Sequence, residues 1–130
     1  MLTAYNDEQS IGDAATDFLS PSRTQRVIVI DNSSADRTVD VARSAGAEVV
    51  IERRPGYGRC VFRALGEGVQ KADTDLTLLC EGDMTLRAFD IDKFMSQYPS
   101  RRYREWDADR RAAPGLLPGH FPWCAVTTVD

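Results

Sequence analysis

The stretch Leu76-Thr77-Leu78-Leu79-Cys80-Glu81-Gly82-Asp83 decides the fold of this 130-residue chain. A short, mostly apolar run ends abruptly in two carboxylates separated by a glycine. Such a run is typical of a strand that is buried on both faces of a parallel sheet. Because open α/β sheets bind ligands at the carboxyl ends of their strands, we expect Glu81 and Asp83 at a ligand-binding edge.

Strand-like runs precede this stretch, and each is followed by a polar loop and a segment with helical spacing of apolar residues. Strands are expected at 1–4, 26–30, 47–51 and 76–80, and helices at 11–19, 36–46 and 58–69, with a short helix at 89–95. Repeated units of this kind form right-handed crossovers. The sequence therefore predicts an α/β fold, with a mainly parallel, Rossmann-like sheet and helices on both faces.

The third helix carries apolar residues that we expect to pack on the sheet: Val61, Phe62, Leu65 and Val69. Gly66 and Gly68 each weaken a helix by roughly 1 kcal/mol relative to Ala. Close packing against the sheet would explain both glycines. Cys60 and Cys80 fall on apolar faces and are expected in the core as reduced thiols, since the chain has three cysteines and no Cys-x-x-Cys pair.

Composition excludes several classes of function. The net charge is −4 and no block of Lys and Arg interleaved with aromatics occurs before residue 100, which argues against a nucleic-acid binder. No apolar run approaches the roughly 20 residues that span a bilayer, and the first residues do not form a signal peptide. We therefore expect a soluble, cytoplasmic chain without a membrane segment. The paired acids alone leave open whether they bind a metal or form a turn.

Polar motifs follow the predicted strands in order: Ala4-Tyr5-Asn6-Asp7-Glu8, the stretch 31–38 (DNSSADRT), Gly56-Tyr57-Gly58 and Glu81-Gly82-Asp83. Together they resemble those of the inverting family-two glycosyltransferases, which have the glycosyltransferase-A fold and use nucleotide-activated sugars. The resemblance covers about residues 2–98. It implies a nucleotide-sugar-binding half of a glycosyltransferase domain at 1–99.

The resemblance also implies roles for individual residues. A divalent cation, Mg²⁺ or Mn²⁺, would act as a Lewis acid on the departing diphosphate, and such hard cations prefer carboxylate oxygens. Asp83 matches the metal ligand, and Glu81 matches the residue near the ribose or the metal shell. Gly82 would let the backbone approach the ligand. Tyr5 and Glu8 would contact the base, and Asp31 and Asn32 would contact the base or the ribose. Gly56 and Gly58 would open a helix whose first N–H groups face an anion. The nucleotide-sugar-binding positions that the resemblance implies, besides Glu81, are Ala4, Tyr5, Asn6, Glu8, Asp31, Asn32, Gly56 and Gly58.

Three positions depart from the family pattern. Asn32 stands where the family commonly has a second Asp, so a charge is replaced by an amide. Glu81 replaces the usual first Asp of the metal motif. Pro55 stands where a basic residue is common, which leaves Arg53 or Arg54 to supply that charge.

Residues 100–130 lose the binary patterning and lack the family's Asp-Ile-Val-x-Gly-x-Arg strand. When the possible codons for residues 101–114 are read one nucleotide later, they can encode a peptide beginning Ala-Asp-Ile-Val-Asn-Gly-Thr-Arg. Only the Gly of this peptide is required, because the single codon of Trp106 followed by the first base of any Asp107 codon can encode nothing else. We hypothesise a frameshift near Ser100; a natural divergent tail is the alternative. Sequencing the locus in all frames distinguishes the two, and an intact frame without this peptide would exclude the frameshift.

The resemblance implies transfer of a sugar from a nucleotide sugar to an acceptor, which could be lipid-linked, in cell-wall or glycan biosynthesis. A carboxylate base would deprotonate the acceptor. No residue before position 100 matches that base, so no catalytic residue is assigned. The chain as written is thus expected to be weakly active or inactive. Alternatives are a non-catalytic nucleotide-binding module and a nonfunctional remnant.

Overall fold

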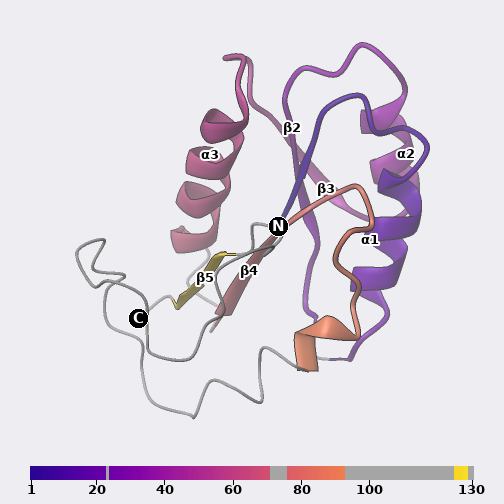
Figure 1. The fold of residues 1–130 in the computed structure, drawn as a ribbon, viewed down its shortest axis with the longest axis vertical. Helices are drawn as coiled ribbons and strands as arrows, with labels where there is room; N and C mark the ends of the chain where they lie inside the picture. Colours follow the sequence, from indigo (N-terminus) through magenta and orange to yellow (C-terminus); the bar gives the residue numbers. More distant parts are fainter. Residues whose placement is uncertain (23, 71–75, 93–124, 129–130) are drawn as a thin grey trace.

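The computed structural model describes residues 1–22, 24–70, 76–92 and 125–128 and has an α/β architecture, as predicted (Figure 1). Its strands are β1 (Leu2–Ala4), β2 (Ile28–Asp31), β3 (Glu48–Ile51), β4 (Leu76–Glu81) and β5 (Ala125–Thr128). Its helices are α1 (Ile11–Leu19), α2 (Thr38–Ser44) and α3 (Tyr57–Val69). Each predicted strand and each of the three longer helices is present, with boundaries shifted by a few residues at most.

The strands form one sheet in the order β3-β2-β1-β4-β5, and the first four run parallel. Although β1 has three residues, it is central and pairs with both β2 and β4. The register aligns Ala4 with Asp31, Asp31 with Ile51, and Thr3 with Glu81. The carboxyl ends of β1, β2, β3 and β4 therefore meet at one edge of the sheet, as predicted from the apolar run that ends at Glu81.

Helices cover both faces of the sheet: α1 and α2 lie on one side and α3 on the other (Figure 1). Successive strand residues point to opposite faces, so each strand supplies two cores. Leu2, Val29 and Cys80 belong to the core beneath α1 and α2. Ile28 and Leu79 belong to the core beneath α3. A continuous apolar run such as that of β2 is thus explained by burial on both faces.

The buried face of α3 agrees with the prediction at Cys60 and Val61 but not at Phe62. Phe62 is 77% exposed, whereas Cys60 and Ala64 are buried against the sheet. A Cβ at Gly68 would lie 2.9 Å from Oγ1 of Thr77, while a Cβ at Gly66 would have no neighbour within 4 Å. Small residues spaced four apart therefore let α3 approach the sheet. Close packing explains Gly68, but that explanation is wrong for Gly66.

The tail contributes a strand that the pattern did not predict. Residues of β5 pair antiparallel with β4, with Leu76 opposite Thr128 and Leu79 opposite Ala125. The run Val126-Thr127-Thr128 is β-branched and so has high strand propensity. The remainder of the predicted 100–130 region lies outside the described residues. The short helix expected at 89–95 begins at Asp90, and its residues beyond 92 also lie outside them. Within the described ranges, no helix has the length and apolarity needed to cross a membrane.

Candidate functional site

The loops that follow β1 and β2 are joined by reciprocal hydrogen bonds. The backbone N–H of Asn6 donates to Oγ of Ser34 at 2.9 Å, and the N–H of Ala35 donates to Oδ1 of Asn6 at 2.9 Å. Asn6 has a φ of 55°, a left-handed conformation that Asn tolerates better than most residues. The predicted binding residue Asn6 thus uses its side chain to hold the two loops together.

A second set of bonds continues this junction toward the starts of α1 and α2. The N–H of Glu8 donates to Oδ2 of Asp36 at 3.2 Å, and the N–H of Arg37 donates to Oε2 of Glu8 at 3.0 Å. The N–H of Asp7 donates to Oγ1 of Thr38 at 2.8 Å. Because so many backbone groups are satisfied, the edge of the sheet around Glu8 is a preorganised surface rather than a pair of independent loops.

Asp31 lies beneath that surface and is only 1% exposed. Its carboxylate accepts hydrogen bonds from the backbone N–H and the hydroxyl of Ser34. A buried carboxylate needs such donors. The structure therefore places Asp31 under the loop that carries Ser34, whereas Tyr5 on the neighbouring loop is 62% exposed. The carbonyl of Ala4 accepts from the N–H of Asn32 at 2.9 Å and links the two strands at this point.

The side-chain amide of Asn32 organises the loop between β3 and α3. Its Nδ2 donates to the carbonyls of Glu52 and Arg54 at 3.0 and 2.8 Å, and its Oδ1 accepts from the N–H of Gly56 at 2.9 Å. A carboxylate has no proton to donate to those two carbonyls. This arrangement explains why Asn replaces Asp at position 32. Gly56 has a φ of 118°, which favours glycine, and Gly58 is exposed in the first turn of α3.

Glu81 lies on the same face of the sheet as α3, because it alternates with Thr77 and Leu79 along β4. Tyr57, in the first turn of α3, lies close enough to Glu81 for the charge of that carboxylate to act on its phenol. Burial raises the pKa of Tyr57, and the negative charge of Glu81 raises it further. Tyr57 was not predicted as a site residue, although its place between two glycines at the start of a helix was a signal for one.

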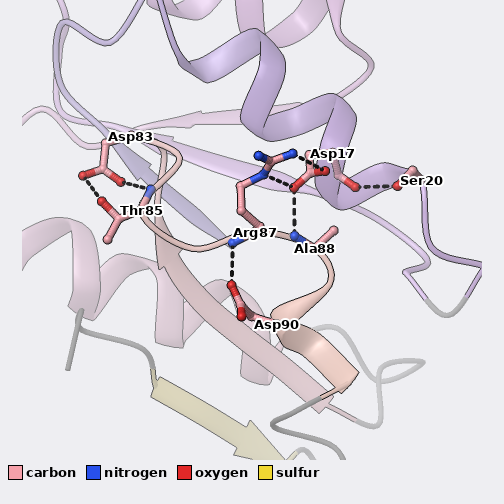
Figure 2. A network of polar contacts seen from close by, with 7 residues as sticks. All are labelled: Asp17, Ser20, Asp83, Thr85, Arg87, Ala88 and Asp90. Carbon is pink, nitrogen blue, oxygen red and sulfur yellow. Dashed lines mark hydrogen bonds and ion pairs between the residues drawn. The ribbon is translucent and has the colours of Figure 1, made fainter.

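Asp83 lies two residues beyond β4, and its side chain is exposed. Its carboxylate accepts hydrogen bonds from the N–H and the hydroxyl of Thr85 at 2.9 and 2.7 Å (Figure 2). A Cβ at Gly82 would lie 2.6 Å from Cδ1 of Ile11 and 3.2 Å from the carbonyl oxygen of Thr3. Packing against α1 and β1 therefore requires this glycine. This packing is a reason for glycine at position 82 besides the ligand approach that the resemblance implies.

Asp7 adds a further carboxylate to this edge. Burial raises its pKa, and the charges of Asp83, Asp36 and Asp31 raise it further, against a lowering by the N–H of Tyr5. The charges of Asp83, Asp36 and Asp31 act on Asp7, so acids from three loops lie in one region. Such a region favours a cation.

The residues present fit a divalent cation held in part by a ligand. Within 1–22, 24–70, 76–92 and 125–128, no group of three or more His, Cys, Asp or Glu side chains is arranged to hold a metal alone. Mg²⁺ is commonly bound through one or two carboxylates together with substrate phosphates. The exposed carboxylate of Asp83 suits that mode, whereas Glu81 is only partly exposed and lies beside Tyr57.

The chain is similar to known proteins over most of its length. The family described as Glycosyl transferase family 2 matches residues 1–99. An uncharacterized glycosyltransferase of Mycobacterium tuberculosis is 36% identical over 105 residues, which cover 77% of this chain and 42% of that protein. Glycosyltransferase AglJ of Haloferax volcanii is 33% identical over 95 residues, which cover 73% of this chain and 30% of that protein. The chain thus spans less than half the length of these relatives.

A solved structure shows the same arrangement of elements. It is glucosyl-3-phosphoglycerate synthase from Mycobacterium tuberculosis in complex with Mn²⁺, UDP-glucose and phosphoglyceric acid. The sequence identity is 25% and the TM-score 0.53, over 62% of this chain and 31% of that one. The same enzyme has also been solved with Mg²⁺ and UDP.

Proposed function

Because the chain belongs to glycosyl transferase family 2, and its four parallel strands form part of the glycosyltransferase-A fold, we propose that it is the nucleotide-sugar-binding half of a glycosyltransferase domain. The observation that carries this proposal is the convergence of three loops at one sheet edge. They bring exposed Tyr5, the amide-braced turn at Asn32 and exposed Asp83 to the carboxyl ends of adjacent strands.

The base of the nucleotide would lie against the ring of Tyr5, on the surface formed by the joined loops after β1 and β2. The hydrogen bonds of Asn6 and Glu8 keep this surface in one conformation, so less ordering is needed when a ligand binds. The first turn of α3, opened by Gly56 and Gly58, would face the anionic part of the ligand with its backbone N–H groups.

Asp83 would hold the divalent cation through its exposed carboxylate, and Thr85 would orient that carboxylate. A bound cation supplies charge that offsets the negative charge of the diphosphate. The Mn²⁺ and UDP-glucose present in the solved relative support this assignment. Glu81, half-buried beside Tyr57, would face the sugar or ribose rather than bind the metal directly.

The base that deprotonates the acceptor is not assigned to any residue of this chain. The relatives are more than twice as long as the matched segment, so the part of the domain that would carry this base has no counterpart in the matched residues. We therefore propose that the chain as written binds the donor with little or no transfer. A nucleotide-binding module without transferase activity is the second candidate, favoured by the same preorganised edge.

Calorimetric titration of the purified chain with UDP and with UDP-glucose, with Mn²⁺ or with EDTA, tests the proposal. We expect saturable binding that requires the metal, and no release of UDP from UDP-glucose beyond a blank without protein. Absence of binding by a chain with a cooperative thermal transition would contradict the proposed function. Sugar transfer or steady UDP release would contradict the proposed inactivity.

A further inference from the structure

The loop after β4, residues 82–89, carries Asp83 near its beginning and is fixed to α1 near its end (Figure 2). Nε and a terminal nitrogen of Arg87 donate to the two carboxylate oxygens of Asp17 at 3.0 and 3.2 Å. The backbone N–H of Ala88 donates to Oδ2 of Asp17 at 2.8 Å. One carboxylate therefore binds a guanidinium in fork geometry and a backbone amide together.

Further contacts make this attachment well defined. The N–H of Arg87 donates to Oδ2 of Asp90 at 3.1 Å, which closes the loop onto the following helical turn. Leu86 and Ala88 are buried in the core beneath α1 on either side of Arg87. The donation from Arg87 lowers the pKa of Asp17, so Asp17 is ionised at neutral pH.

Few residues separate Asp83 from this attachment, and they are themselves held in place. Asp83 and Thr85 are joined in a closed turn, and Leu86, the next residue, is 9% exposed. Arg87 follows directly. A displacement of Arg87 relative to α1 is thus transmitted to Asp83 through one buried residue.

The other end of α1 is tied to the nucleotide-facing loop. The N–H groups of Ser10 and Ile11 donate to the carbonyl of Asp7 at 3.0 and 2.9 Å. Asp17 lies in the same helix, so α1 connects the loop that carries Tyr5 with the loop that carries Asp83.

We propose that Asp17 is a positioning residue, which through Arg87 and Ala88 sets the place of Asp83 relative to the loop after β1. The cation and the diphosphate would then be aligned with the base by a contact made at the far end of α1. The effect on metal and diphosphate binding rests on the proposed function, whereas the attachment of Arg87 and Ala88 to Asp17 can be tested without any ligand.

The chain offers a matched control. Arg63 and Glu67 on α3 form an ion pair at 2.9 Å with side-chain exposures of 46% and 18%, close to the 44% and 21% of Arg87 and Asp17. The full chain would be compared as wild type, Asp17→Asn, Arg87→Lys and Glu67→Gln. Amide hydrogen exchange without ligand reports on the attachment, and electron paramagnetic resonance of Mn²⁺ in the presence of UDP reports on metal affinity.

We expect Asp17→Asn to remove protection at the Thr85 and Ala88 amides and to weaken Mn²⁺ binding roughly tenfold, the low end of the range for residues that orient a metal ligand. Arg87→Lys, which keeps the charge but loses the fork, should give an intermediate loss, and Glu67→Gln should change neither readout.

Unchanged protection in Asp17→Asn would overturn the attachment, whether or not the metal binds. Lost protection with unchanged Mn²⁺ affinity would overturn the positioning role alone. A wild-type chain that binds no Mn²⁺ with UDP, but shows the exchange effect, would overturn the proposed function and with it the positioning role.

Discussion

The side-chain oxygen of Asn32 accepts a hydrogen bond from the backbone N–H of Gly56 at 2.9 Å, which ties the end of β2 to the start of α3. The amide nitrogen of the same residue holds two carbonyls of the intervening loop. A position that is commonly acidic in the family is therefore a structural amide in this chain.

Replacement Asn32→Asp should destabilise the chain although it restores the common family residue. The carboxylate would oppose the carbonyls of Glu52 and Arg54 without a proton to donate, which we expect to lower the free energy of unfolding by about 1 to 3 kcal/mol. Urea denaturation at pH 7 measures this. Equal or greater stability in the variant would show that the amide contacts do not hold the loop.

Replacement Gly82→Ala should also destabilise the chain, because the new Cβ would meet fully buried Ile11 at 2.6 Å. Overpacking of this kind typically costs about 1 to 3 kcal/mol. Gly66→Ala is the control: its Cβ has no neighbour within 4 Å, and we expect a gain of up to about 1 kcal/mol from helix propensity. Equal effects of the two substitutions on urea denaturation would contradict the packing role of Gly82.

The carboxyl of Asp7 should make the chain less stable as the pH rises. Burial, with the neighbouring acids, raises its pKa above the usual 3.8, so the ionised form is disfavoured in the folded state. That penalty is absent below pH 3.8 and complete above the folded pKa. Asp7→Asn keeps an acceptor for the N–H of Tyr5 and should raise Tm at pH 7.

Thermal denaturation of wild type and Asp7→Asn across the acidic range checks this sign. The difference in Tm should vanish below pH 3.8, where both side chains are neutral. A variant that melts lower at pH 7 would mean that the charge of Asp7 stabilises the fold, contrary to the acidic environment described above.

Features set by local pattern were predictable from the sequence. The two-sided burial of Leu76 to Cys80 follows from a continuous apolar run, and the meeting of Glu81 with the first strand follows from parallel crossovers. The exposure of Phe62 was mispredicted because this residue is apolar, whereas the close approach of helix and sheet is made by small residues.

Features set by distant partners were not predictable. Asn32 is bonded to residues 20 to 24 positions away, and Asp17 to residues 70 and 71 positions away. Neither pairing leaves a periodic signal. The packing of Gly82 was not predicted, because its neighbour Ile11 lies in α1, far away in the sequence.

Glu81 and Asp83 are expected to have different roles at the end of β4. Mn²⁺ titration followed by electron paramagnetic resonance in the presence of UDP tests this difference most directly. We expect Asp83→Asn to weaken Mn²⁺ binding at least roughly tenfold, as for loss of a metal-site contact, and Glu81→Gln to change it little, since Glu81 is half-buried on the face of the sheet that α3 covers whereas Asp83 is exposed. Unchanged binding in Asp83→Asn, with loss of binding in Glu81→Gln, would contradict the account.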